Sequence, residues 1–465
     1  MIKSSTIAAL ADTLRDHVAR LQPGDQLPST RDLVKGHRVS PVSVARALAI
    51  LVADGLVTTR PGAGTFVAER RPLTAPDAVD SSWQTVALGD RAIDASAIQV
   101  YLEAIPAGTI AMAGGYLHHS MRPNRALSSA LMRAARLPDA WDRPPLQGVS
   151  SLRAWFAESI GGGVTPEDVV ITSGGQAAMS VALRAIVPAG APLLVEAPTY
   201  PGALAVARAA GIRPVPVPID SNGIRPDLLA EAFRVTDARA VYLQPTYQNP
   251  TGAVLSPERR EQVLAVAHDA GAFIIEDDYA RALSHDGPPP PPLIANDVDG
   301  RVVHIASLTK PAAPSLRVGA LSARGPVAER IRALRIVDDL FVARFLQDAA
   351  LELVTAPGWP RYLSGLSAEL RRRRQRLLAA LTEHAPGFQV ALIPRGGMHI
   401  WVRLPDGTDE NAVFAACRQA GVLGSMGRAY FAAESPGPYM RLSFVGAPHL
   451  DDLDEGVRRL ASAVR

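Results

Sequence analysis

Residues 301–319, RVVHIASLTKPAAPSLRVG, contain the stretch that decides the fold. An apolar strand-like run, VVHIAS, ends shortly before Lys310, and Arg317 follows that lysine by seven residues. A lysine at a strand end in a buried cleft loses its proton readily and becomes a nucleophile. A lone lysine is more often a surface charge, so the meaning of Lys310 depends on the motifs around it.

Outward from Lys310, short apolar runs alternate with stretches whose apolar residues recur at helical spacing. The runs are DVVITSGG (168–175), APLLVEAP (191–198), AVYLQP (240–245), AFIIEDD (272–278) and VVHIAS (302–307). Such runs between amphipathic helices are typical of a parallel sheet covered by helices on both faces. We therefore expect an α/β fold from about residue 99 to residue 465.

Polar residues follow two of these runs. Asp277 and Asp278 end AFIIEDD, Tyr279 comes next, and Asn249 follows AVYLQP in QPTYQNPTG. Acids at a strand end often only cap a loop, and Asn-Pro-Thr-Gly is also a turn sequence. Ligands of α/β sheets nevertheless bind at the carboxyl ends of strands. The pattern favours a polar site at this edge, with either acid as its carboxylate.

Three further motifs point to the same site. TSGGQAAM (172–179) opens a helix after an apolar run, and such a glycine-rich turn binds phosphate through backbone N–H groups. Arg441 in YMRLSF has the planar fork that binds a carboxylate bidentately. Tyr200 in EAPTYPG offers an aromatic ring, although a loop aromatic usually only packs. Each motif is weak alone, and their order along the chain gives them weight.

The first 68 residues have a different pattern, which predicts three short helices and a hairpin. The expected helices lie within 7–21, 29–37 and 39–55, and the hairpin within 56–68. Ser29 or Thr30 caps the second helix, and Ser40 caps the third with Pro41 at its first position. Gly55 is expected to end the third helix. The hairpin runs, LVTTR and TFVA, flank a glycine-rich tip.

Composition and charge limit the function further. The chain has 465 residues, a formal net charge of +3 and one cysteine, Cys417, so no intrachain disulfide or multi-cysteine metal site forms. Residues 1–70 hold nine Lys and Arg against six Asp and Glu, so the whole positive excess lies there. We expect a cytoplasmic protein without a membrane span or a bound metal, in which the N-terminal segment contacts a polyanion. Residues 69–98, with RRPLTAPDAVDSS, are expected to be a linker.

The N-terminal pattern closely resembles the winged helix-turn-helix of GntR-type bacterial regulators. The resemblance rests on LPSTRDL (27–33), VSPVSVARAL (39–48) and DGLVTTRPGAGTFV (54–67). It implies that the third helix enters the major groove of double-stranded DNA and that the hairpin forms the wing. The implied DNA-contacting residues are Arg31, Ser40, Ser43, Arg46, Arg60, Gly62 and Gly64. Pro41 and Ala45 stand where relatives often carry arginine, which leaves the operator sequence open.

Residues 99–465 resemble the fold-type I aminotransferases, which use pyridoxal phosphate (PLP). The resemblance implies a large subdomain of about 120–325 and a small α+β subdomain of about 330–465. Lys310 then carries the internal aldimine, Asp277 pairs with the pyridinium nitrogen, and Arg441 binds the carboxylate of a substrate or effector. The other implied cofactor-binding residues are Gly174, Gly175, Gln176, Tyr200, Asn249, Tyr279, Ser307, Thr309 and Arg317. Arg143 stands where the family has a tyrosine that reaches the phosphate of the neighbouring subunit.

A winged helix joined to such a domain resembles the MocR subfamily of GntR regulators. The resemblance implies a homodimeric, PLP-dependent transcription regulator that senses PLP, or an amine or amino acid, through Lys310. An active aminotransferase that carries a DNA-binding domain is the alternative, since the set of catalytic residues appears whole. In a third interpretation PLP is only structural. The effector and the sign of regulation are not readable from the sequence.

Overall fold

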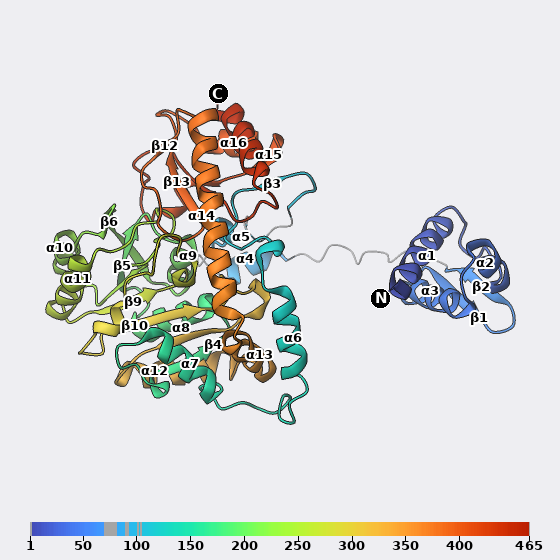
Figure 1. The fold of residues 1–465 in the computed structure, drawn as a ribbon, viewed down its shortest axis with the longest axis horizontal. Helices are drawn as coiled ribbons and strands as arrows, with labels where there is room; N and C mark the ends of the chain where they lie inside the picture. Colours follow the sequence, from blue (N-terminus) through green and yellow to red (C-terminus); the bar gives the residue numbers. More distant parts are fainter. Residues whose placement is uncertain (1, 69–80, 89–92, 100–101, 103–104, 465) are drawn as a thin grey trace. The chain divides into compact units, whose positions relative to one another are not determined.

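The computed structural model describes residues 2–68, 81–88, 93–99, 102 and 105–464. The chain divides into two units, Met1–Arg91 and Ala92–Arg465 (Figure 1). Each unit has its own core of buried apolar side chains. The division falls inside the predicted linker. Within that range the structure has two short helices, α4 (Ser82–Leu88) and α5 (Ser96–Gln99), while residues 69–80 lie outside the described part. The domain boundaries stay a prediction.

The N-terminal unit has the predicted order of three helices and a hairpin. Its elements are α1 (Ile2–Val18), α2 (Thr30–His37), α3 (Pro41–Ala53), β1 (Val57–Arg60) and β2 (Gly64–Val67). Leu14, Val44 and Leu51 are buried between these elements, at positions that the helical spacing predicts. The antiparallel pair β1–β2 closes at Arg60, which lies opposite Gly64. The result is a small winged helix-turn-helix.

The helix caps follow from local chemistry. The Ser29 side chain accepts a hydrogen bond from the Asp32 N–H of α2, and the Ser40 side chain accepts one from the Ser43 N–H of α3, each at 3.2 Å. A serine oxygen in this position satisfies an N–H group that the helix leaves unpaired. Gly55 follows α3 with φ of 69°, a conformation that glycine adopts without strain.

The second unit is built on a mixed eight-stranded sheet of order β4-β11-β10-β9-β8-β5-β6-β7. Strands β6, β5, β8, β9 and β10 run parallel to one another, as the sequence predicts. Strand β11 is antiparallel to both of its neighbours, β10 and β4, which corrects the expectation of a purely parallel sheet. The reason is the short connection from Ser307 to Gly319, which returns the chain beside β10 without a crossover helix. The bounds are β4 (Val169–Thr172), β5 (Pro192–Ala197), β6 (Arg213–Asp220), β7 (Gly223–Ile224), β8 (Ala240–Leu243), β9 (Phe273–Asp277), β10 (Val302–Ser307) and β11 (Gly319–Ser322).

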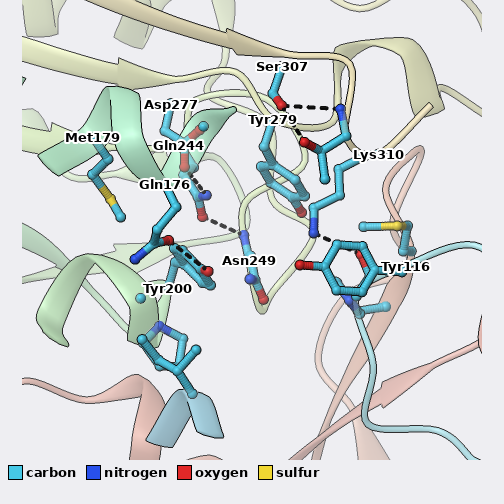
Figure 2. Close-up of a pocket in the computed structure, with 18 of the residues that line it drawn as sticks. Tyr116, Gln176, Met179, Tyr200, Gln244, Asn249, Asp277, Tyr279, Ser307 and Lys310 are labelled. Atoms are coloured by element: carbon cyan, nitrogen blue, oxygen red, sulfur yellow. Dashed lines mark hydrogen bonds between the residues drawn. The ribbon is translucent and has the colours of Figure 1, made fainter. Parts of the chain in front are cut away.

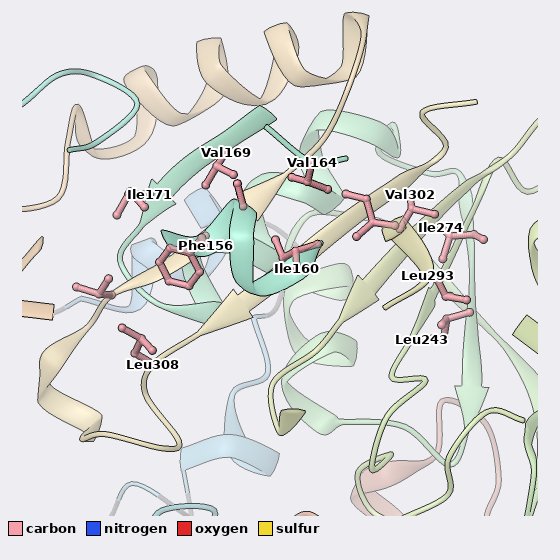
Figure 3. Packing of buried hydrophobic residues seen from close by; sticks show 14 of the residues in the cluster. Phe156, Ile160, Val164, Val169, Ile171, Leu243, Ile274, Leu293, Val302 and Leu308 are labelled. Carbon is pink, nitrogen blue, oxygen red and sulfur yellow. The ribbon is translucent and has the colours of Figure 1, made fainter. Parts of the chain in front are cut away.

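Helices cover both faces of this sheet. In β5, Leu193 and Val195 pack on one face, and Leu194 between them packs on the other, so this part of the strand is apolar on both faces. One face is covered by α8 (Gly175–Ile186), α9 (Pro201–Ala209) and α12 (Pro326–Asp339). The opposite face, part of which Figure 3 shows, is covered by α7 (Ser150–Ile160), α10 (Pro226–Thr236), α11 (Pro257–Asp269) and α13 (Arg344–Thr355). Because apolar side chains pack against both faces, the sheet is held firmly, and with it the strand ends that carry the site.

A smaller α+β layer completes the unit. Its antiparallel sheet has the order β12-β13-β16-β15, with β12 (Gln389–Val390), β13 (His399–Arg403), β15 (Ser425–Met426) and β16 (Tyr439–Ser443). The long helix α14 (Trp359–His384) joins the layers, because Trp359 packs in the large core and Leu377 in the small one (Figure 1). The remaining elements are α6 (Asn124–Ala134), α15 (Glu410–Gln419), α16 (Asp451–Val464), and the pair β3 (Ile110–Ala111) and β14 (Val422–Leu423). Strand β3 thus brings a segment from before residue 120 into the small layer.

Candidate functional site

A cavity of about 460 Å³ lies at the carboxyl ends of the parallel strands. Its wall includes residues that follow β8, β9 and β10, together with residues from the β13 and β16 strands of the small layer (Figure 2). This is the edge where the sequence predicts a site. Eleven predicted residues line it: Gly175, Gln176, Tyr200, Asn249, Asp277, Tyr279, Ser307, Thr309, Lys310, Arg317 and Arg441.

Lys310 lies just past the end of β10 and points into the cavity. Its Nζ donates a hydrogen bond to the Gly115 carbonyl at 2.9 Å and lies 4.1 Å from the centre of the Tyr116 ring. Burial, with Arg441 and Arg317 nearby, lowers the pKa of Lys310 from 10.5 to about 7, although Asp277 acts in the opposite direction. A substantial fraction of the amine is therefore neutral near pH 7. A neutral amine is the nucleophilic form of lysine.

Asp277, the last residue of β9, is the carboxylate of the site. Its Oδ2 accepts hydrogen bonds from the Tyr242 hydroxyl at 2.7 Å and from Gln244 Nε2 at 2.8 Å. Burial raises the pKa of Asp277, and these two bonds act against that rise because they favour the ionised form. A cation in the cavity would favour the ionised form further. Asp278 instead lies within salt-bridge distance of His304 and Arg281, and it does not line the cavity.

Asn249 and Arg441 meet at the opposite wall. Arg441 Nη1 donates to Asn249 Oδ1 at 3.0 Å, and Arg441 Nη2 donates to the carbonyl of Ala113. Since the oxygen of Asn249 accepts from Arg441, its Nδ2 is the end that donates to a ligand. The buried guanidinium of Arg441 also lies 5.3 Å from the centre of the Tyr430 ring. A buried arginine lining a cavity is suited to bind a carboxylate.

The glycine-rich turn for which the sequence predicts phosphate binding lies where α8 begins. Gly174, with φ of 84°, precedes this helix, and the first N–H groups of α8 have no partner inside it. A Cβ atom on Gly174 would lie 3.0 Å from the Arg317 guanidinium carbon, so glycine lets the arginine approach. Ser307 Oγ donates to Thr309 Oγ1 at 2.9 Å beside this turn. A helix N-terminus, a guanidinium and two hydroxyls form a cradle for an anion.

The two tyrosines predicted for the site lie on different sides of the cavity. The Tyr200 hydroxyl donates to Gln176 Oε1 at 3.3 Å, and its ring lies on the cavity wall between β5 and α9 (Figure 2). The Tyr279 hydroxyl donates to the Tyr247 carbonyl at 2.8 Å. Gly174 is the one predicted cofactor-binding residue that does not line the cavity, because it lies behind the Arg317 side chain.

Several side chains of the cavity were not singled out from the sequence: Tyr116, Gln244, Met179, His399 and Tyr430. Gln244 ends the run AVYLQP, and both of its amide atoms are used, because Oε1 also accepts from the Asn249 N–H at 3.1 Å. The position of Gln244 at the carboxyl end of β8 is the sequence signal that could have identified it as a site residue. Tyr116 lies nearly 200 residues before Lys310, and no local pattern links the two.

The predicted DNA-contacting residues gather on α2, α3 and the β1–β2 hairpin. Arg31 and Arg46 are exposed, and the Ser40 and Ser43 hydroxyls lie 2.9 Å apart at the start of α3. The Arg60 guanidinium lies 4.9 Å from the centre of the Phe66 ring, across the hairpin. Gly62 and Gly64 have φ of 76° and 118° at the tip. A Cβ atom on Gly64 would lie 2.6 Å from Gln26 Nε2, which donates to the Ala63 carbonyl.

Comparisons with known proteins match a family model to each of the two units. Residues 6–67 match the family model of bacterial regulatory proteins, gntR family, and residues 123–460 match that of aminotransferase class I and II. The chain is 28% identical to the uncharacterized HTH-type transcriptional regulator YdfD of Bacillus subtilis over 95% of this chain and 92% of that protein. It is 28% identical to the HTH-type transcriptional regulator TauR of Rhodobacter capsulatus, over 96% and 93%.

Among solved structures, the chain resembles LysN, the alpha-aminoadipate aminotransferase of Thermus thermophilus complexed with N-(5'-phosphopyridoxyl)-L-leucine. The TM-score is 0.76 at 30% identity, over 82% of this chain and 98% of that one. The kynurenine aminotransferase of Pyrococcus horikoshii, solved with PMP, has a TM-score of 0.76 at 27% identity, over 83% and 98%. Both are PLP-type aminotransferases of the fold described above.

The fold and the site define a class: a fold-type I aminotransferase domain preceded by a winged helix-turn-helix. The chain belongs to the aminotransferase class I and II family, and it is a GntR-type transcription regulator of the MocR subfamily. In the part of the chain that the structure describes, no helix combines the length and the apolar character needed to cross a membrane.

Proposed function

We propose that this protein is a DNA-binding transcription regulator whose C-terminal domain binds PLP and senses PLP, or an amine or amino acid, through Lys310. The observation that supports this most directly is a single cavity lined by Lys310, Asp277, Asn249 and Arg441, in a chain whose first unit is a GntR-type DNA-binding domain. The domain resemblance supports PLP as the cofactor, and the donor set fits it.

The residues fit the ring of this cofactor. PLP supplies an aldehyde that reacts with amines and a pyridine ring that withdraws electrons. Lys310 provides the neutral amine for the aldehyde, and Asp277 holds the proton at the pyridine nitrogen. Asn249 Nδ2 would donate to the phenolic oxygen, and the Tyr279 hydroxyl would donate there in exchange for its bond to the Tyr247 carbonyl. The Tyr200 ring stacks on the cofactor.

The phosphate of the cofactor and the carboxylate of the effector would be held at two different places. The cradle of Gly174, Gly175, Gln176, Ser307, Thr309 and Arg317 takes the phosphate, because it combines backbone N–H donors, two hydroxyls and a cation. Arg441 takes the carboxylate of an amino-acid effector, exchanging its bond to Asn249 for a bidentate one. An effector whose amine reacts with the aldehyde beside Lys310 and whose carboxylate binds Arg441 would be an amino acid or a close analogue.

We propose that α3 of the first unit binds the major groove of an operator, with Ser40, Ser43 and Arg46 facing the DNA. Arg31 contacts the phosphate backbone, and the wing tip at Arg60, Gly62 and Gly64 approaches the minor groove. Exposed arginine and a helix N-terminus are the groups that bind DNA phosphates.

The regulator is proposed to act as a homodimer, which presents two winged helices to two half-sites. Large apolar side chains stay exposed around 131–146, among them Trp141 at 76%, Met132 at 57% and Leu146 at 47%, which supports contact with a second copy. Arg143 lies in the same exposed segment. In a dimer its positive charge would lie near the phosphate of the cofactor bound by the partner subunit. An effector changes DNA affinity only as far as it binds one conformation of this dimer more tightly than another.

The K310A variant tests the proposal. Wild-type protein is expected to bind PLP covalently and to change its affinity for the DNA beside its own gene when PLP and an effector are added. K310A retains a folded DNA-binding unit but loses both the covalent bond and the response. If regulation by PLP and by every amine tested is intact in K310A, PLP is only structural. A multiple-turnover assay with amino donors and 2-oxo acids tests the aminotransferase alternative separately.

A further inference from the structure

His399 is a buried polar residue of the cavity to which the proposed function assigns no role. It is the first residue of β13, is 4% exposed, and lines the same wall as Arg441. Its Nε2 has no hydrogen-bond partner among the described residues. A buried ring nitrogen without a partner costs free energy, unless a ligand supplies the missing bond.

The protonation state of His399 follows from its surroundings. Burial lowers the pKa of His399 well below its ordinary value, and the cationic side chains of Arg441 and Lys310 lower it further. The ring is therefore neutral. A hydrogen bond between the ring and the backbone of Gly114 raises the pKa of His399, because donation from a ring N–H to a carbonyl favours the protonated ring. With one ring nitrogen donating to the backbone, Nε2 of the neutral ring is an acceptor.

The position of Nε2 relative to Lys310 defines the part of a ligand that it meets. The point where a Cβ atom would lie on Gly115 is 3.6 Å from Lys310 Nζ and 3.9 Å from His399 Nε2. Gly115 itself fills none of this space, because it has no side chain. Both nitrogens thus border one small region of the cavity, so an effector whose amine reacts beside Lys310 would bring its neighbouring carbon atoms close to His399 Nε2.

We propose that His399 determines the specificity of the effector site by accepting a hydrogen bond from an uncharged donor on the effector side chain. A hydroxyl or an amide N–H fits this acceptor, whereas the lone pair repels a carboxylate. A second ammonium group is disfavoured, because Arg441 already places positive charge beside the ring. The inference rests on the proposed function, since it names the class of amino acid that the sensor selects: small, with a hydroxyl or amide side chain.

Calorimetric titration of the full-length, PLP-loaded protein with matched amino acids tests this. L-homoserine and L-norvaline have nearly the same shape and differ in a terminal hydroxyl, as do L-serine and L-2-aminobutyrate. Wild type is expected to bind the hydroxyl member of the better-binding pair about 10-fold more tightly. H399F removes the acceptor and is expected to abolish the preference. H399Q, whose amide oxygen can reach a similar position, is expected to restore part of it.

The outcomes separate this inference from the proposed function. If no amino acid binds to loaded wild type, amino-acid sensing itself fails, and the role of His399 fails with it. If amino acids bind but the matched pairs do not differ, or if H399F keeps the preference, sensing stands and the specificity role is overturned. PLP absorbance and thermal melting of each variant are recorded in parallel. An H399F protein that folds but no longer retains PLP would show that His399 binds the cofactor, which also overturns the proposal.

Discussion

The amine of Lys310 is held in a buried site beside two arginines, and its low pKa has a measurable consequence. Because this pKa is about 7, the neutral amine that reacts with PLP dominates above pH 7 and becomes scarce below it. The rate of covalent PLP loading is expected to rise about 10-fold from pH 6 to pH 8. Stopped-flow absorbance of the cofactor measures it. A rate that stays constant over this range would contradict the assignment, and K310A provides the baseline without covalent loading.

The lowered pKa of Lys310 also affects the free energy of unfolding. In the unfolded chain this lysine has its ordinary pKa of 10.5, so the unfolded state binds more protons between pH 7 and pH 10.5. The free energy of unfolding of the PLP-free protein therefore receives a contribution from Lys310 that increases with pH through this window. Comparing denaturant unfolding of wild type and K310A at pH 7 and pH 9 isolates that contribution. A wild-type gain no larger than the K310A gain would argue against a depressed pKa.

Gln244 is expected to hold the site in place, because it connects Asp277 to the Asn249 backbone. The Q244A variant loses one of the two bonds on Asp277 Oδ2 and the bond from the Asn249 N–H. We expect PLP affinity to fall about 10-fold, since one to two net hydrogen bonds are lost. Equilibrium dialysis measures the affinity. Y242F, which removes only the other bond to Asp277, is the matched comparison. Unchanged affinity in both variants would show that Asp277 needs neither support.

At the scale of elements, the wing depends on glycine at position 64. G64A places a Cβ atom at φ of 118° and 2.6 Å from Gln26 Nε2, so the backbone is strained and the bond from Gln26 to the Ala63 carbonyl is disturbed. We expect the N-terminal unit to lose about 1 kcal/mol or more of stability, and DNA affinity to fall. G36A in α2 is the control, because no atom lies within 4 Å of its added Cβ. Equal melting and equal DNA binding in the two variants would contradict this account of the wing.

The recognition helix carries a second prediction at this scale. R46A removes a proposed DNA contact on α3, and the slope of log affinity against log salt concentration is expected to become shallower by about 0.9 if that contact is a phosphate. Fluorescence anisotropy over a range of salt concentrations measures the slope. R20A removes the same charge just past the end of α1, outside the proposed interface, and is expected to leave the slope nearly unchanged. Identical slopes for both variants would show that Arg46 makes no phosphate contact with the DNA.

Sequence patterns predicted most of these elements because the signals are local. The Ser40 cap, the run VVHIAS as β10, and the glycine turn before α8 each depend on neighbouring residues. Strand β11 (Gly319–Ser322) and its antiparallel direction were missed, since the apolar runs considered ended at β10 and apolar periodicity carries no information about strand direction. Tyr116 and His399 were missed for a related reason. Both reach the cavity through tertiary packing of the small layer, which no short motif encodes.

At the scale of the whole molecule, two units with separate cores share one chain. Among the described residues, no buried apolar cluster mixes side chains of the two units, so each unit is expected to fold on its own set of contacts. We propose that PLP binding by the second unit changes DNA binding by the first.

Binding of the purified full-length protein to the intergenic DNA beside its own gene tests this claim most directly. The affinity is measured with and without PLP at two salt concentrations, because counterion release makes non-specific binding strongly salt-dependent. We expect tight, sequence-specific binding that resists salt and changes when PLP is added, and a K310A protein that binds without this response. No specific binding in either state would rule out a PLP-sensing regulator and would favour an enzyme to be tested for transamination.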